Sequence, residues 1–190
     1  MSLFKSLAIV GATLLPTASS ADWSGFYFGA SVGNVTEGEL ELSSGTVQEI
    51  EEAMPFGFFI GYQSQNGRFV FGGEFAYAAA DDIELEDAIV DVAYGEGDLK
   101  ARLGYDFGNV LGYGVISRSA IAVSTSAEDV VASGLGFGFG ADIKVSHNFT
   151  VGAEFMFRDL NGEYEINDLV VDDDVDFRAN TINLRASVRF

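Results

Sequence analysis

Apolar and polar residues alternate one by one at the end of the chain. Ile182, Leu184, Ala186, Val188 and Phe190 are apolar, and the residues between them are polar or cationic. A period of two places successive side chains on opposite faces of a β-strand. The pattern therefore predicts a strand with one face toward an apolar environment and the other toward a polar one.

The same alternation recurs along the chain. It is found in residues 23–33, 54–63, 68–78, 98–107, 110–123, 134–145, 149–160 and 181–190. None of these eight segments has the period of an amphipathic helix. One face carries Phe, Leu, Ile and Val, whereas the other carries polar residues and many glycines, which occupy every second position from Gly134 to Gly140. Small residues on the polar face fit the narrow interior of a closed barrel.

The connections between the segments alternate in length. Those at about 36–53, 80–98, 124–132 and 161–179 are long and acidic, and the three between them are short. Short turns at one end and long loops at the other are typical of outer-membrane barrels. We therefore predict an all-β fold, an eight-stranded antiparallel transmembrane β-barrel with short periplasmic turns and long acidic extracellular loops.

The first residues predict export. One Lys precedes an apolar stretch at 7–15, and Ser19 and Ala21 occupy the two positions that a signal peptidase reads. The apolar stretch is too short to span a bilayer. We expect a cleaved signal peptide at 1–21 and a barrel domain at 22–190. The chain has no Cys, which excludes a lipoprotein anchor and thiol chemistry.

Four motifs resemble the small outer-membrane β-barrel family that includes the OmpA-type transmembrane domain and the opacity-like surface proteins of Gram-negative bacteria. They are "WSGFYFGASVG", "RLGYDFGN", "FTVGAEFMFRDL" and the terminal "NLRASVRF". The resemblance implies an integral protein of the outer membrane. Val188 and Phe190 resemble the signal that the barrel-assembly machinery reads. Members of the family are structural proteins, adhesins or proteins without assigned function, and because the chain ends at its eighth strand we expect no peptidoglycan-binding domain.

Most of the 29 acidic residues fall in the predicted loops, whereas most cations fall in the predicted strands. Strand parity assigns a charge network to the inner face: Arg68, Glu74, Lys100, Arg102, Arg118, Asp142, Lys144, Glu154, Arg158, Arg185 and Arg189. Such a network could line an ion pathway or fill the lumen with paired charges. We favour the filled lumen, because eight strands enclose little more than side chains and buried charges require partners.

Aromatic residues gather near the periplasmic strand ends and predict an interfacial girdle. They are Trp23, Tyr62, Phe69, Tyr105, Phe107, Phe149 and Phe190.

The sequence predicts no catalytic residue, no metal site and no cofactor. Outer-membrane hydrolases depend on a His base, and the only histidine, His147, falls in a short periplasmic turn. The acidic run "VVDDDVDF" lacks the Gly and final Glu of a calcium loop. The net charge of −19 and the scarcity of loop cations argue against nucleic-acid binding.

We therefore predict a structural or surface-interaction role, in envelope integrity or adhesion. The expected partners are outer-membrane lipid and lipopolysaccharide, the barrel-assembly machinery and a surface partner of the acidic loops. A small porin is the first alternative, and a lipid-modifying enzyme is the second. A soluble lipocalin-type barrel is the third, and polarity opposes it because such a barrel carries its apolar face inside.

Overall fold

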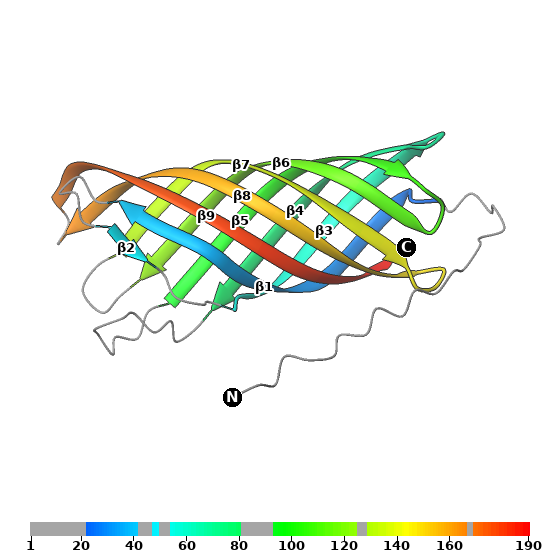
Figure 1. The fold of residues 1–190 in the computed structure, drawn as a ribbon, viewed down its shortest axis with the longest axis horizontal. Coiled ribbons are helices and arrows are strands. Elements are labelled where there is room, and N and C mark those ends of the chain that lie inside the picture. The colour runs from blue at the N-terminus through cyan, green and yellow to red at the C-terminus, as the bar shows by residue number, and fades with distance from the viewer. Residues whose placement is uncertain (1–21, 42–46, 50–53, 81–92, 125–128, 167–168) are drawn as a thin grey trace, which may run out of the picture.

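The computed structural model describes residues 22–41, 47–49, 54–80, 93–124, 129–166 and 169–190, so the predicted signal peptide lies outside the described residues. The strands are β1 (Gly25–Glu41), β2 (Val47–Glu49), β3 (Phe56–Asn66), β4 (Phe69–Ala80), β5 (Ala93–Asp106), β6 (Val110–Ser124), β7 (Asp129–Lys144), β8 (Phe149–Ile166) and β9 (Leu169–Arg189). Figure 1 shows the long strands wrapped obliquely around one axis. Within the described residues, no helix is long and apolar enough to cross a membrane.

The barrel is antiparallel and closed. Each strand from β3 to β8 pairs with the next, and β1 pairs with both β3 and β9. The closing seam runs from Tyr27 opposite Arg189 to Glu41 opposite Asp176, with a β-bulge between Val35 and Glu37. The predicted eight-stranded antiparallel barrel is confirmed, because β2 is a short addition that pairs only with the far end of β1.

One end of the barrel has short turns. The β3–β4 and β5–β6 connections contain Gly67 at φ 63° and Gly108 at φ 98°, a left-handed conformation that glycine adopts without a steric penalty. These turns and the C-terminus lie at the same end of Figure 1. We call this the turn end, and the opposite end the loop end.

The two faces of the barrel have opposite polarity. On the outer face Leu135, Phe137 and Phe139 are 69%, 61% and 61% exposed. Neighbouring strands match aromatic residues across this face: the ring centroids of Phe137 and Phe157 lie 5.0 Å apart, and such cross-strand pairs stabilise sheets. A continuous apolar outer wall would be unfavourable in water and is suited to lipid.

The strands extend beyond the predicted limits at the loop end. β8 has 18 residues and β9 has 21, whereas a tilted strand needs only about 10 to cross a bilayer. β5 includes Glu96 and Asp98, which the sequence pattern had assigned to a loop. The remaining predicted loop residues at 42–46, 50–53, 81–92, 125–128 and 167–168 lie outside the described residues.

Candidate functional site

The lumen residues come from strands whose alternation continues without interruption. In β5, Tyr94, Glu96, Asp98, Lys100 and Arg102 are all buried and share one face. β4 contributes Glu74, β7 contributes Asp142, β8 contributes Glu154 and Arg158, and β9 contributes Arg185. The barrel therefore brings side chains from five strands together inside one closed wall.

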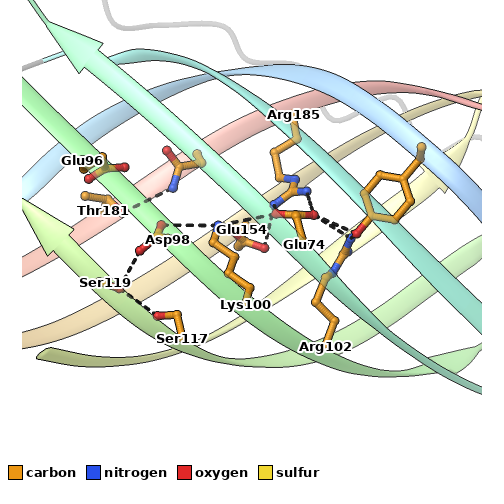
Figure 2. Close-up of polar contacts among 12 residues, drawn as sticks. Glu74, Glu96, Asp98, Lys100, Arg102, Ser117, Ser119, Glu154, Thr181 and Arg185 are labelled. Atoms are coloured by element: carbon orange, nitrogen blue, oxygen red, sulfur yellow. Dashed lines mark hydrogen bonds and ion pairs between the residues drawn. The ribbon is translucent and has the colours of Figure 1, made fainter.

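Glu74 lies at the centre of this group (Figure 2). Its Oε2 accepts hydrogen bonds from Arg102 Nη1 at 3.1 Å, Arg185 Nη2 at 2.5 Å and the Tyr27 hydroxyl at 2.9 Å. Its Oε1 accepts from Arg185 Nη1 at 2.9 Å and lies 3.6 Å from Lys100 Nζ. One buried carboxylate therefore contacts three cations, which is the arrangement that makes a buried charge tolerable.

A second group lies toward the loop end. Arg158 Nη2 donates to Asp98 Oδ2 at 2.8 Å and to Glu96 Oε1 at 3.3 Å. Arg158 Nη1 donates to the Thr181 hydroxyl at 2.9 Å, and the Ser119 hydroxyl donates to Asp98 at 2.5 Å. The guanidinium and both carboxylates are buried and hydrogen-bonded to partners from other strands.

Glu154 and Lys100 join the two groups. Lys100 Nζ donates to Glu154 Oε1 at 2.6 Å and lies 3.7 Å from Asp98 Oδ2. Glu154 Oε2 accepts from Arg185 Nη1 at 2.8 Å. Nine charged residues thus form one connected network, which we call the lumen network: Glu74, Glu96, Asp98, Lys100, Arg102, Asp142, Glu154, Arg158 and Arg185.

Apolar side chains close the lumen on the turn side of the network. Trp23, Val70, Leu111, Tyr113, Val115 and Met156 form one buried cluster. The Arg102 guanidinium carbon lies 3.7 Å from the Tyr113 ring centroid, so the network and the cluster are in direct contact. At the loop side, Ile121, Leu160 and Ala179 are also buried. Met156 lies between Glu154 and Arg158 along β8, so the apolar cluster extends from the turn end to the level of the lumen network, and buried apolar residues lie on both sides of the charges.

Trp23 anchors the N-terminal segment inside the turn end. Its indole N–H donates to Asp106 Oδ1 at 3.1 Å, and its backbone N–H donates to Gln65 Oε1 at 2.7 Å. Its carbonyl accepts a hydrogen bond from Arg189 Nη1. Trp23 is completely buried, so its predicted place in the aromatic girdle is wrong; Tyr62, Phe69, Phe107, Phe149 and Phe190 are exposed.

The structure places the predicted charge residues in three locations. Glu74, Lys100, Arg102, Asp142, Glu154, Arg158 and Arg185 belong to the lumen network. Lys144 and Arg189 lie at the mouth of the turn end, beside Trp23. The inward assignment of Arg118 is wrong: its side chain is exposed on the outer face and its Nη2 donates to the Ser133 hydroxyl at 3.1 Å. Arg68 is also exposed, and it lies in the turn that precedes β4.

Sequence reasoning missed Glu96 and Asp98. An available signal was the parity of Tyr94, Glu96, Asp98 and Lys100, which continues from the predicted strand into the acidic stretch.

The turn-end mouth contains a polar cavity of about 590 Å³. Asp22, Lys144, His147, Asn148 and Arg189 are among the residues that line it. The Ser24 N–H donates to Asp22 Oδ1 at 2.9 Å, and hydrogen bonding to Ser24 lowers the pKa of the Asp22 carboxyl below its usual value. His147 is exposed. In the described parts of the chain, no group of three or more His, Asp or Glu residues is arranged to hold a metal ion.

Residues 6–190 match the family model described as the outer membrane protein beta-barrel domain. The chain belongs to this family. It is an integral protein of the Gram-negative outer membrane, and because short turns in such barrels are periplasmic, the turn end is its periplasmic end.

Similar proteins have different activities. Over 204 residues the chain is 27% identical to the 25 kDa outer-membrane immunogenic protein of Brucella ovis, covering 90% of this chain and 97% of that protein. Its fold is similar to that of Ail of Yersinia pestis, with a TM-score of 0.56, 18% identity and coverage of 87% and 99% of the two chains. It is also similar to the protease OmpT of Escherichia coli, with a TM-score of 0.51, 8% identity and coverage of 87% and 97%. Because one fold can carry adhesion or proteolysis, function has to be argued from the residues.

Proposed function

We propose that this protein is a sealed outer-membrane barrel with a structural and surface-interaction role. The observation that carries the proposal is the continuous lumen network centred on Glu74, in which every cation contacts at least one carboxylate. Paired and hydrogen-bonded charges stabilise a filled interior, although the buried Arg102 Nε has no partner, whereas a conducting pore needs continuous water along its axis.

The packing on both sides of the network also supports a sealed barrel. The buried cluster runs from Trp23 at the periplasmic end to Met156 beside the network, and Ile121 and Leu160 are buried toward the cell surface. A small cavity beside Lys100 and Arg185 has a volume of only about 10 Å³, which is the space of one water molecule. These features disfavour the porin alternative.

The enzyme alternative lacks an assembled base. His147 is exposed in the turn between β7 and β8, and no described residue forms a hydrogen bond with its imidazole. A catalytic His needs a group that orients it and a nucleophile or water within hydrogen-bond reach. The Ser146 hydroxyl is instead occupied by the Phe149 N–H at 3.2 Å.

The loop-end parts of β8 and β9, which we call the acidic extension, are suited to surface interaction. β9 carries Asp172, Asp173, Asp174 and Asp176 in its outer half, with Arg178 as the adjacent cation. Ail was solved with the heparin analogue sucrose octasulfate, a polyanion. This chain has a net charge of −19, the same sign as that ligand, so it favours a cationic partner and repels polyanions.

Planar-bilayer recording of the purified barrel tests the sealed lumen. We expect no steady conductance, with a porin of about 16 strands reconstituted in the same way as the positive control. A reproducible, long-lived open state that disappears in Arg102→Ala would show that water crosses the network, and the porin alternative would replace this proposal.

Single cysteines test which end faces the surface, because the chain has none of its own. Asn161 is exposed near the loop end of β8, and His147 is exposed at the turn end. A membrane-impermeant maleimide should label Asn161→Cys on intact cells and His147→Cys only after permeabilisation. Labelling of His147→Cys on intact cells would show that the turn end faces the cell surface, and the acidic extension could then have no surface role.

Binding of cells to a polyanion and to a polycation tests the surface role itself. Cells that produce the barrel should not be retained on heparin beads but should bind a polylysine surface more than cells without it. The variant with Asp172, Asp173 and Asp174 changed to Asn should lose most of this difference. Equal binding by all three strains would refute the interaction role and leave only the structural one.

A further inference from the structure

The periplasmic mouth contains two cations that the lumen network does not include. Lys144 Nζ lies 4.4 Å from the ring centroid of Trp23, and the Arg189 guanidinium carbon lies 5.2 Å from the same centroid. Both residues line the cavity of about 590 Å³ at this end. Two positive charges therefore flank one indole at the edge of an open cavity.

Neither cation forms an ion pair with a carboxylate among the residues that the structure describes. Lys144 Nζ donates to the carbonyl oxygen of Asp22 at 2.6 Å, and Arg189 Nη1 donates to the carbonyl oxygen of Trp23. The cations of the lumen network differ, since each of them lies within ion-pair distance of at least one carboxylate. The periplasmic pair is thus hydrogen-bonded to neutral oxygens, and nearby carboxylates such as Asp22 attract it only at distances longer than an ion pair.

The nearby carboxylates are committed to other donors. Asp106 Oδ1 accepts from the Trp23 indole N–H and from the Gly108 N–H at 2.7 Å, and its Oδ2 accepts from Gln65 Nε2 at 2.9 Å. Asp22 Oδ1 accepts from the Ser24 N–H. These bonds engage both oxygens of Asp106, whereas Asp22 also lines the cavity and attracts Lys144 and Arg189 without forming an ion pair with either.

Arg189 provides a second, independent observation. Its side chain lies in the cavity wall, the residue is only 8% exposed, and its Nε has no hydrogen-bond partner. A buried donor without an acceptor is costly, and more so when the group is charged. The Nε atom has almost no accessible surface, so an anion in the cavity would neutralise the pair through the charge of the guanidinium as a whole rather than through a bond to Nε.

We propose that the periplasmic cavity binds a phosphate-type oxyanion between Lys144 and Arg189. An oxyanion offers several acceptor oxygens to a planar guanidinium and to an ammonium, and such charge-assisted bonds are the strong class. Asn109 and Asn148, which also line the cavity, supply neutral amide donors around it. The ligand is either free phosphate from the periplasm or the phosphate of an inner-leaflet phospholipid headgroup.

Trp23 is the only tryptophan of the chain and lies against both cations, so its fluorescence reports on the cavity. The protein is purified from outer membranes into a phosphate-free maltoside detergent and titrated with inorganic phosphate at constant ionic strength. In parallel, micelles are doped with short-chain phosphatidylglycerol. Phosphorus NMR line broadening of the same samples detects binding even where the fluorescence does not change.

We expect a saturable response in the millimolar range. Lys144→Gln should raise the midpoint about tenfold or more, because one charge-assisted hydrogen bond is lost. Arg189→Lys, which keeps the charge but loses the planar fork, should weaken binding less. Arg68→Gln is the matched control, since it removes an exposed cation near the same end that does not line the cavity.

The outcomes separate the sources and the alternatives. Saturation by inorganic phosphate supports a small-anion site, and saturation by the lipid alone supports a headgroup site. No response in either arm by both methods would overturn the proposal. An equal loss in Lys144→Gln and Arg68→Gln would also overturn it, because it would show general charge attraction rather than a site; heat-modifiable migration verifies that each variant is folded.

Discussion

Replacing Glu74 tests whether the lumen network holds the barrel together. Glu74→Ala removes the acceptor of Arg102, Arg185 and the Tyr27 hydroxyl at once, in a position where the side chain is fully buried. The loss of one member of a buried ion pair costs about 3 to 5 kcal/mol, since it leaves the remaining charge without compensation.

The structure favours the lower end of that range. After the substitution Arg102 still has Asp142 at 2.7 Å, and Arg185 and Lys100 still have Glu154 at 2.8 and 2.6 Å. Each cation therefore keeps one carboxylate, and we expect a loss of about 3 kcal/mol. With a urea dependence of about 1 to 3 kcal/mol per molar, the unfolding midpoint should fall by about 1 to 3 M.

Urea unfolding followed by Trp23 fluorescence and by heat-modifiable migration measures this shift. Asp159→Ala is the matched control, because it removes an exposed acid on the outer face and should change stability by less than about 0.5 kcal/mol. Glu74→Gln keeps the volume and should lie between the two. An unchanged midpoint for Glu74→Ala would refute the view that the network stabilises the barrel.

Three further predictions follow from the seam, the outer face and the N-terminus. Deleting Phe190, whose ring stacks on Phe28 at 5.7 Å, should lower the amount of folded, heat-modifiable protein in outer membranes, as quantified by immunoblot; unchanged levels would argue against an assembly signal. Arg118→Gln should shift the urea midpoint far less than Glu74→Ala, because it loses only an exposed bond to Ser133. Mass spectrometry of the purified protein should find Asp22 as the first residue, and an intact leader would exclude the predicted cleavage.

Strand positions and faces could be predicted because one rule governs the whole barrel. Successive side chains of a strand point to one face or the other. Once the Phe-rich positions of β7 are assigned to the outer face, Gly134 to Gly140 must therefore lie on the inner face. The shared inward orientation of Glu74 and Arg102 could be predicted for the same reason. The partners of each charge could not, because they depend on the stagger of strands that are distant in sequence, such as β4 and β9.

The errors have separate physical causes. In β6 both faces carry apolar residues, Val115 inside and Ile116 outside, so the charge of Arg118 was the only guide and it pointed the wrong way. A long Arg side chain can remain on an apolar wall when its head reaches a polar neighbour. Glu96 and Asp98 fall in a predicted loop because the acidic composition of the stretch outweighs the alternation from Tyr94 to Lys100, which continues the strand beyond the thickness of the bilayer. Trp23 was assigned to the girdle because a local pattern cannot separate an interfacial indole from a buried one.

The closing seam determines when the barrel can be completed. Tyr27 in β1 pairs with Arg189 in β9, so the seam can form only after the last strand has been synthesised. Contacts between such distant positions make folding slow, since the chain entropy is lost before the seam can form. Until then β1 and β9 each present an unpaired edge, which is a template for aggregation. A newly exported chain therefore needs its edges protected until β9 arrives, and any truncation before Arg189 prolongs that exposure indefinitely.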